Sequence, residues 1–278
     1  MRRIALLTLL LGIGSGCATR VDEPEMRPTR RPPPTRRPPP PRPLPTPVPT
    51  APQGERVTQI GASVQGEPIF LHTFGAGLDP LFIFAGIHGS EPTSSFVAQR
   101  LIEWLRDNPP AYAGRPIAIA PRTNPDGLKR RQRGNAHGID LNRNFPASNW
   151  ARGGGQRYNS GPGAASEPET RAIMQAMEQL NPVAVISIHS ISGARQCNNY
   201  NGPARPLAEL LARHNGYPPT GDIGYPTPGS FGTWAGNDRS IPVITLELPR
   251  SQSGAASWEQ NRAALLAAIQ ATPRELGR

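Results

Sequence analysis

The stretch LFIFAGIHGSEP, residues 81–92, decides the fold of this chain, because it predicts a buried strand that passes directly into a helix. Its opening run LFIFAG is continuously apolar, as in a strand that is covered on both faces of a sheet. Pro92 favours the first turn of a helix, and His88 and Glu91 therefore lie where the strand gives way to that helix. Large apolar residues are predicted on one face of the helix: Phe96, Leu101, Trp104 and Leu105.

The same alternation continues along the rest of the chain. The patterns predict strands at residues 57–63, 68–74, 116–121, 183–188 and 241–246, and further helices at residues 166–180, 207–214 and 258–269. Residues 122–166 form a long connection that is rich in Gly, Asn and Arg, and compact domains rarely keep such a connection without a function. Strands that alternate with helices predict an α/β fold, an α/β/α sandwich with a mixed, largely parallel central sheet.

The first 53 residues differ from the rest of the chain. Residues 1–16 contain two arginines and an apolar stretch of about ten residues, which predicts a secretory signal peptide too short to span a membrane. Cys17 follows small residues in a pattern that resembles a bacterial lipoprotein box, so we expect its lipidation; an ordinary cleaved signal is the alternative. Residues 17–53 are rich in Pro and Arg without an apolar period, which predicts an extended, disordered linker before a folded domain at residues 54–278.

The formal net charge of +10 lies mostly in the first 53 residues. Nine arginines and three acidic residues precede Gly54, which is +6, and the remaining residues carry +4. A basic, proline-rich segment can contact anionic lipid or a cell-wall polymer, but a solvated spacer is the simpler interpretation. No nucleic-acid-binding motif accompanies the charge, so nucleic acid is not an expected partner. Cys197 is the only cysteine besides Cys17, so we expect a lone thiol.

Histidine and carboxylate side chains follow three of the predicted buried strands: His88 and Glu91 after the first, His189 after the second and Glu247 after the third. Open α/β sheets place their sites beyond the carboxyl ends of the strands, so these side chains should meet at one edge. Two imidazoles and one carboxylate, with one position left for water, form a known catalytic zinc set. Glu247 could then accept a proton from that water, whose pKa zinc lowers to about 7.

Five linked motifs resemble those of the zinc carboxypeptidases of the carboxypeptidase A type. In chain order they are HxxE at residues 88–91, NPDG at 124–127, DLNRN at 140–144, SIHS at 187–190 and TLEL at 245–248. The segment YPTPGSFG, residues 225–232, is similar to the murein peptide amidase branch of that family. Enzymes of this branch cut the bond between γ-D-glutamate and meso-diaminopimelate in cell-wall peptides. The resemblance implies the zinc carboxypeptidase fold and a metallopeptidase.

The resemblance also implies a metal centre and a base. His88, Glu91 and His189 would bind one Zn²⁺ ion, and Glu247 would act as the catalytic general base and then as the general acid. The other histidines of the chain are expected not to be ligands: His72, His137 and His214.

Three further residues match positions that bind substrate or stabilise the reacting carbonyl group. Asn142 and Arg143 match the pair that holds the terminal carboxylate of the substrate, a task for which the fork of a guanidinium is suited. Arg133 matches the catalytic arginine that polarises the scissile carbonyl. Two neighbouring arginines are alternatives for that role: Arg130 and Arg131.

Some positions are matched by place or depart from the family pattern. Tyr225 is the candidate for the mobile, substrate-binding tyrosine that closes over the substrate. Ile191 stands where the carboxypeptidase A-type enzymes have a tyrosine, two residues after the third ligand. Phe231 falls near the position that sets specificity, and Arg195 is a candidate partner for the charged head of diaminopimelate.

The sequence thus predicts a zinc-dependent peptidase or amidase that hydrolyses murein peptides. A general metallocarboxypeptidase that releases C-terminal amino acids is one alternative, and a non-catalytic peptidoglycan-binding lipoprotein on a peptidase fold is another. Deacylases of the aspartoacylase type share the HxxE start, but the NPDG motif argues against them. We expect the protein on the periplasmic side of a bacterial cell envelope, anchored through Cys17. The outer membrane is preferred because Ala18 is not a retention signal of the aspartate type; nothing indicates an oligomeric state.

Overall fold

The structure is a computed structural model that describes residues 54–77, 79–153 and 158–278. The predicted signal peptide, the lipidation site at Cys17 and the linker up to residue 53 lie outside these residues. None of the helices in the described ranges has both the length and the apolar character that crossing a bilayer requires.

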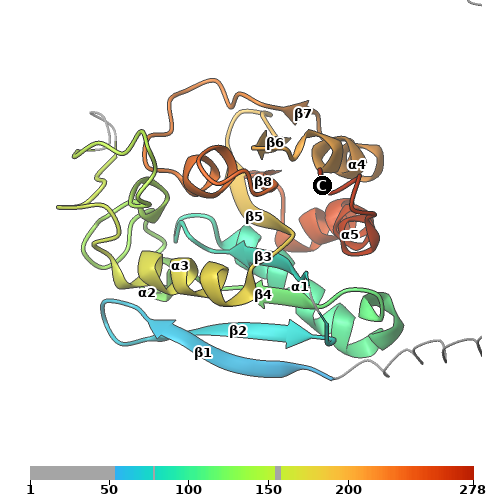
Figure 1. Ribbon diagram of the computed structural model, residues 1–278. Helices are drawn as coiled ribbons and strands as arrows, with labels where there is room; N and C mark the ends of the chain where they lie inside the picture. Colours follow the sequence, from blue (N-terminus) through green and yellow to red (C-terminus); the bar gives the residue numbers. More distant parts are fainter. Residues whose placement is uncertain (1–53, 78, 154–157) are drawn as a thin grey trace, which may run out of the picture. The chain divides into compact units, whose positions relative to one another are not determined.

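Within the described residues, one eight-stranded sheet runs through the domain (Figure 1). Its strands are β1 Arg56–Ala62, β2 Pro68–Phe74, β3 Leu81–Ala85, β4 Ile117–Ala120, β5 Ala184–Ile191, β6 Cys197–Asn201, β7 Pro219–Thr220 and β8 Val243–Pro249. The spatial order is β1-β2-β4-β3-β5-β8-β6-β7. The four central strands β4, β3, β5 and β8 are parallel to one another. The pairs β1–β2, β2–β4 and β6–β8 are antiparallel, and β7 is parallel to β6. The sheet is mixed with a parallel centre, as predicted.

Helices and turns cover both faces of this sheet. On one face, α1 Pro92–Asp107, α4 Arg205–Asn215 and α5 Gly254–Gln270 enclose an apolar core. On the other face, α3 Pro168–Leu180 and the π-helical turn Gly232–Asn237 enclose a second core. Figure 1 shows α4 and α5 side by side, away from α3. The remaining short elements are the 3₁₀ turn Pro109–Tyr112, α2 Pro125–Arg130 and the 3₁₀ turn Leu141–Arg143. The α/β/α sandwich is confirmed.

Strand β3 shows why its sequence is continuously apolar. Leu81, Ile83 and Ala85 belong to the core beneath α1, α4 and α5, whereas Phe82 and Phe84 belong to the core on the opposite face. All five side chains are fully buried. Successive residues of a strand point to opposite faces, so a strand that is covered on both sides needs an apolar residue at every position.

Two parts of the sequence-based assignment need correction. Phe96 is 42% exposed, and the buried stripe of α1 instead contains Val97 and Ala98 along with Leu101 and Leu105. Phe96 lies at the margin of that stripe, beside the first residue of α5. Strands β6 and β7 were not predicted, because their short polar sequences contain no apolar run. They form by pairing: β6 lies against β8, and β7 lies against β6.

Candidate metal centre and active site

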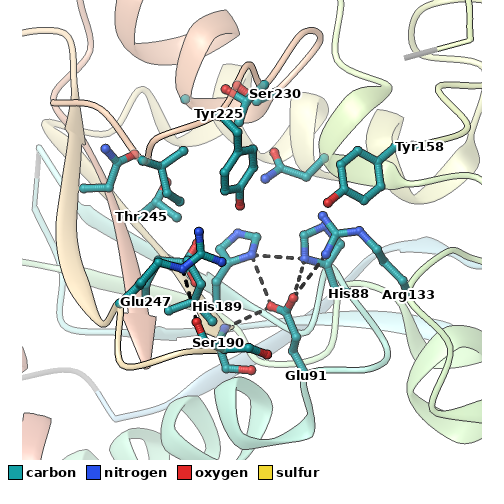
Figure 2. A pocket seen from close by; sticks show the side chains of 18 of the residues that line it. His88, Glu91, Arg133, Tyr158, His189, Ser190, Tyr225, Ser230, Thr245 and Glu247 are labelled. Atoms are coloured by element: carbon teal, nitrogen blue, oxygen red, sulfur yellow. Dashed lines mark hydrogen bonds and ion pairs between the residues drawn. The ribbon is translucent and has the colours of Figure 1, made fainter. Parts of the chain in front are cut away.

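Two histidines and a glutamate converge at the carboxyl end of the central strands (Figure 2). His88 and Glu91 lie on the loop between β3 and α1, and His189 lies in β5. His88 Nδ1 is 3.0 Å from Glu91 Oε1, and His189 Nδ1 is 3.2 Å from His88 Nδ1 and 3.3 Å from Glu91 Oε2. All three side chains are buried, so they form a compact cluster of possible metal ligands.

The donor set fits zinc. A tetrahedral zinc ion with Zn–N distances of about 2.0–2.1 Å separates two nitrogen ligands by roughly 3.3 Å, and the two Nδ1 atoms here are 3.2 Å apart. The other ring nitrogens have partners: His88 Nε2 lies 2.9 Å from Asp140 Oδ1, and His189 Nε2 lies 2.9 Å from Ser187 Oγ. Such partners orient a metal-binding imidazole and leave its second nitrogen for the ion. With Glu91, the cluster offers the three protein ligands of a catalytic zinc site.

The backbone of the metal-binding loop is held from two sides. Glu91 precedes α1 with φ −121° and ψ 56°, a non-helical conformation that the following proline favours. The side chain of Asn124 donates to the carbonyl of Ile87 at 3.1 Å and accepts from the backbone N–H of Gly127 at 2.9 Å. A Cβ atom on Gly89 would collide with the backbone of Gly127, so this close approach requires glycine. The NPDG motif therefore supports the loop that carries the ligands.

The charges of the cluster depend on one another. Burial opposes ionisation of Glu91, but His88 and His189 outweigh it and hold the pKa of Glu91 well below its ordinary value. Burial also lowers the pKa of His189, which favours the neutral imidazole that a metal binds. At His88 the effect of burial is overcome by Glu91 and Asp140, and the pKa of that imidazole is raised. These shifts describe the protein side chains alone, and a divalent cation would favour the ionised carboxylates further.

The sheet positions Glu247. This residue lies in β8, and the parallel register pairs it with His189 of β5. Register partners on neighbouring strands point to the same face, so both side chains reach the same cavity. Glu247 is buried, and burial together with the carboxylate of Glu91 raises the pKa of Glu247 to about 8. Its position is compatible with the predicted general base, which must lie within hydrogen-bond reach of a water at the metal.

A cavity of about 200 Å³ adjoins the cluster. Arg133 lines it, donating from Nε to Asp140 Oδ2 at 2.8 Å and from Nη1 to Glu91 Oε1 at 3.4 Å. The alternatives Arg130 and Arg131 are exposed and do not line this cavity. The charged residues of the lining are four arginines, two glutamates and the two ligand histidines: Arg133, Arg143, Arg195, Arg250, Glu91, Glu247, His88 and His189.

Arg143 is buried to an extent that is unusual for a guanidinium. Its side chain is 1% exposed, and its Nε has no hydrogen-bond partner among the described residues. Nη1 donates to the carbonyl of Asn142 at 2.7 Å, and the guanidinium lies 4.8 Å from the ring centroid of Tyr158. Burial lowers the pKa of Arg143. Because a buried donor without an acceptor is costly, this guanidinium is prepared to bind a ligand that supplies one.

Tyr225 lies on the wall of the cavity that faces the three possible metal ligands. Figure 2 shows its ring between the ribbon above and the ligands below, with the hydroxyl pointing toward His189. The side chain is partly buried and lines the cavity, as do Ile191 and Arg195. Tyr225 is therefore placed where a side chain can cover a bound substrate. Ile191, at the position where the resemblance implies a tyrosine, contributes an apolar side chain to the wall.

Phe231, which the sequence places near the specificity position, does not itself line the cavity. It is buried in an aromatic cluster, with its ring centroid 4.8 Å from that of Phe84 and 5.3 Å from that of Phe145. Its backbone N–H donates to Asn142 Oδ1 at 2.9 Å, which leaves the amide NH₂ of Asn142 as a donor in the cavity. Gly232 lines this part of the wall instead. Phe231 is absent from the lining because its side chain faces the core at the start of a helical turn.

Three residues of the site were not singled out from the sequence. Asp140 lies within the DLNRN motif, so the signal for it was present without a role attached. Tyr158 contacts the guanidinium groups of Arg133 and Arg143 at 4.6 and 4.8 Å, but it comes from the irregular connection and no motif marks it. Arg250 follows the last residue of β8, so the strand-end argument that identified Glu247 extends to it.

Comparison with known proteins agrees with this geometry. Residues 49–202 match the family model described as zinc carboxypeptidase. Murein peptide amidase A of Escherichia coli is 34% identical over 227 residues, which cover 75% of this chain and 90% of that protein. Murein peptide amidase A of Vibrio campbellii is 32% identical over 234 residues, covering 78% of this chain and 88% of that protein.

A solved structure leads to the same family. The murein-tripeptide amidase of Escherichia coli O157 superposes with a TM-score of 0.66 at 30% identity, covering 79% of this chain and 93% of that chain. The match includes the mixed eight-stranded sheet and the helices on both of its faces. The sequence match, the shared fold and the zinc-compatible triad together show that this chain belongs to the zinc carboxypeptidase family and is a metallopeptidase that uses zinc.

Proposed function

We propose that this protein hydrolyses murein peptides at the amide bond between γ-D-glutamate and meso-diaminopimelate. The observation that carries the proposal is the buried guanidinium of Arg143, with an unpaired Nε, in a cavity beside three zinc-compatible ligands. A substrate carboxylate would supply the missing acceptor. The murein peptide amidases among the relatives of this chain support the choice of substrate class.

The clamp for that carboxylate consists of Arg143 and Asn142. Charge-assisted hydrogen bonds from a guanidinium to a carboxylate are stronger than neutral ones and fix the orientation of both groups. The amide NH₂ of Asn142 adds a donor whose orientation is set by the N–H of Phe231. A terminal carboxylate held here leaves the preceding amide bond facing His88, Glu91 and His189. This arrangement suits an enzyme that acts on the last residue of a peptide.

The lining also suits the side chain of diaminopimelate, which ends in an ammonium group and a second carboxylate. Asn199, Ser230 and Thr245 contribute polar groups to the wall. Burying a charged side chain against an apolar wall would be costly, whereas hydrogen-bonding partners reduce that cost. The four arginines of the lining outnumber its two glutamates, which favours a substrate with several carboxylates.

The residues of the site divide the reaction between them. His88, Glu91 and His189 would hold a zinc ion, which would supply a water of lowered pKa and polarise the carbonyl. Glu247 would accept a proton from the attacking water as the water oxygen bonds to the carbonyl carbon. Arg133 donates to the carbonyl oxygen while negative charge develops on it. Glu247 then passes the proton to the amide nitrogen, the C–N bond breaks, and diaminopimelate leaves as the free amine.

Product analysis on defined peptides tests the proposal. L-Ala-γ-D-Glu-meso-diaminopimelate should yield L-Ala-D-Glu and diaminopimelate, and a chelator should abolish the reaction until zinc is restored. Glu247→Gln should keep its zinc and lose turnover, which separates catalysis from metal binding. Release of ordinary C-terminal amino acids at the same efficiency would instead indicate a general carboxypeptidase, and no reaction on either class would overturn the proposal.

The place of action is a proposal that rests on the sequence. A signal peptide at residues 1–16 and a lipidated Cys17 would anchor the enzyme on the periplasmic side of the cell envelope, with the outer membrane preferred. The linker at residues 17–53 would let the catalytic domain reach murein at a distance from that membrane. The location agrees with the proposed substrate, which is part of the envelope.

A further inference from the structure

Arg250 lies at the rim of the cavity, just after strand β8. Its Nη2 is 3.1 Å from Glu91 Oε1 and 3.1 Å from the carbonyl of Ser190, and its backbone N–H donates to the carbonyl of Ile191 at 2.9 Å. These contacts hold one edge of the guanidinium close to the ligand cluster. These contacts fix the position of the side chain, although it is 44% exposed and part of it faces solvent.

Most of the donors of this guanidinium are uncommitted. Nε and Nη1 of Arg250 make no hydrogen bond to any of the described residues, and both of its side-chain hydrogen bonds use Nη2. Nη1 carries two N–H groups and Nε carries one, and each can donate a charge-assisted hydrogen bond to a carboxylate oxygen. Arg250 can therefore keep its contact with Glu91 and bind a second anion at the same time.

Arg250 and Arg143 lie on different sides of the ligand cluster. Arg143 stacks against Tyr158, whereas Arg250 binds the carbonyl of Ser190. Figure 2 shows Tyr158 and Ser190 on opposite sides of the two imidazoles. If Arg143 holds the leaving amino acid, Arg250 is on the side where the acyl half of the substrate lies.

A groove continues from Arg250 on that side. It has a volume of about 500 Å³ and is lined by residues that follow β5 and β8, including Ser192, Gln196 and Arg250 itself. Gln196 Oε1 is buried there and has no hydrogen-bond partner among the described residues, so it can accept from a peptide N–H. The groove and the cavity share Ile191, Ser192 and Arg250. A peptide chain that extends away from the metal would thus pass Arg250 directly.

The chemistry of a γ-linked glutamate places a charge at this point. When glutamate is joined through its γ-carboxyl group, its α-carboxylate stays free, whereas an ordinary α-linked residue uses its α-carboxyl group in the scissile bond and has a carboxylate there only if its side chain is acidic. Four carbon–carbon bonds of about 1.5 Å separate the two carboxyl carbons, which is roughly 5 Å in an extended chain. The guanidinium of Arg250 lies within hydrogen-bond distance of Glu91, so it is close enough to the metal ligands to reach an α-carboxylate about 5 Å from the scissile carbonyl carbon.

We infer that Arg250 binds the free α-carboxylate of the γ-linked acidic residue on the acyl side of the scissile bond. This makes Arg250 a specificity-determining residue that distinguishes γ-glutamyl peptides from ordinary peptides, and the inference rests on the proposed function. With Arg143, it gives the substrate two guanidinium contacts, one on each side of the bond that is cut. A role limited to orienting Glu91 is the competing explanation, because Arg250 also contacts that ligand.

A pair of substrates separates the two explanations. L-Ala-γ-D-Glu-meso-diaminopimelate is compared with the same peptide in which the α-carboxylate of glutamate is an α-carboxamide, so the scissile bond is unchanged. A charge-assisted hydrogen bond to a partly exposed guanidinium should change affinity on the order of tenfold. We expect kcat/KM of the wild type to be about tenfold higher for the acid than for the amide. In Arg250→Gln this ratio should fall to within about twofold, and Arg250→Lys should retain part of it.

The ratio is insensitive to loss of metal, because zinc occupancy affects both substrates equally. Zinc content is measured for each variant, and Arg213→Gln, a half-exposed arginine of α4, serves as the matched control that leaves both rates unchanged. If Arg250→Gln lowers both rates by the same factor and keeps the ratio, Arg250 only orients Glu91 and the inference is overturned. A wild-type ratio near one overturns it as well.

A binding measurement keeps the inference separate from the proposed function. Calorimetry on Glu247→Gln gives the Kd of both peptides without turnover, and the double variant with Arg250→Gln gives the contribution of the guanidinium. Failure of the wild type to cut either peptide would contradict the proposed function alone, provided that the acid still binds about tenfold tighter than the amide. Equal Kd values for acid and amide would overturn the assignment of Arg250, whatever the enzyme cuts.

Discussion

Replacing Asp140 with asparagine removes one negative charge that three parts of the site share. Asp140 Oδ1 lies 2.9 Å from His88 Nε2 and accepts from the backbone N–H of Asn142 at 3.0 Å. Oδ2 accepts from Arg133 Nε at 2.8 Å. The carboxylate thus orients a metal ligand, positions the arginine expected to stabilise the carbonyl oxygen, and begins the turn that carries Asn142 and Arg143, the proposed substrate clamp.

Asparagine has the same shape but only one acceptor oxygen. If that oxygen faces His88, the amide NH₂ meets the N–H of Arg133; if the amide flips, the NH₂ faces His88 instead. The first orientation leaves the N–H of Arg133 unpaired, and the flipped one leaves both His88 Nε2 and the backbone N–H of Asn142 without an acceptor. Removing the partner of a metal-binding imidazole typically lowers metal affinity 10–100-fold, or about 1.4–2.8 kcal/mol. Asp140→Asn should therefore bind zinc between about 10- and 100-fold more weakly and, at saturating zinc, show kcat/KM lowered at least tenfold.

Zinc affinity is measured by competition with a chelator, and kcat/KM is measured at saturating zinc on the murein tripeptide. Asp238→Asn is the matched control, because Asp238 is exposed and bonds Ser148 away from the cavity. Circular dichroism confirms that both variants are folded. Zinc affinity within about twofold of the wild type, in a folded Asp140→Asn variant, would show that this carboxylate does not orient His88.

Four further outcomes are expected. Zinc binding should weaken as the pH falls, because a metal needs the neutral imidazole. Burial lowers the pKa of His88, but the carboxylates of Glu91 and Asp140 raise it above its ordinary value, so the loss should begin at a higher pH than for a free histidine. Chelator competition measured across pH tests this. Arg143→Lys should raise KM for the murein tripeptide at least tenfold with a smaller change in kcat, since a point charge replaces a two-pronged donor. Steady-state kinetics measures both constants, and a larger change in kcat than in KM would contradict the prediction. Gly89→Ala should destabilise the zinc-free protein by about 1–3 kcal/mol in denaturant unfolding, because its methyl group would strike the backbone of Gly127; an unchanged midpoint contradicts this. Cys17→Ala should move the protein from the membrane fraction to the soluble fraction, and unchanged partitioning would remove the lipid anchor.

The sequence alone was sufficient for the elements that have a strong period and for the ligands at their ends. The apolar run at residues 81–85 identified a strand that is covered on both faces, and Pro92 identified the start of α1. His88, Glu91, His189 and Glu247 could be grouped because parallel strands bring their carboxyl ends to one edge of a sheet. Register in β5 and β8 then places His189 beside Glu247.

Other features depend on contacts between segments that are distant in the chain. Helical periodicity set the face of α1 only approximately, so Phe96 was predicted to be buried and is exposed. The sequence placed Phe231 near the specificity position, but only the fold shows that its side chain packs in the core against Phe84 and Phe145, which come from other elements. Strand β6 has no apolar run and exists because β8 offers it a free edge.

The arrangement of charges in the site was also decided by the tertiary structure. Asp140 reaches His88 across 52 positions of the chain, and Arg250 reaches Glu91 across 159. Local periodicity reports which face of a strand or helix is buried, but it contains no information on where a side chain from an irregular connection will point. That direction is set only when the segments pack together. The sequence thus determined the fold class and the metal ligands, whereas packing determined which carboxylates and guanidinium groups surround them.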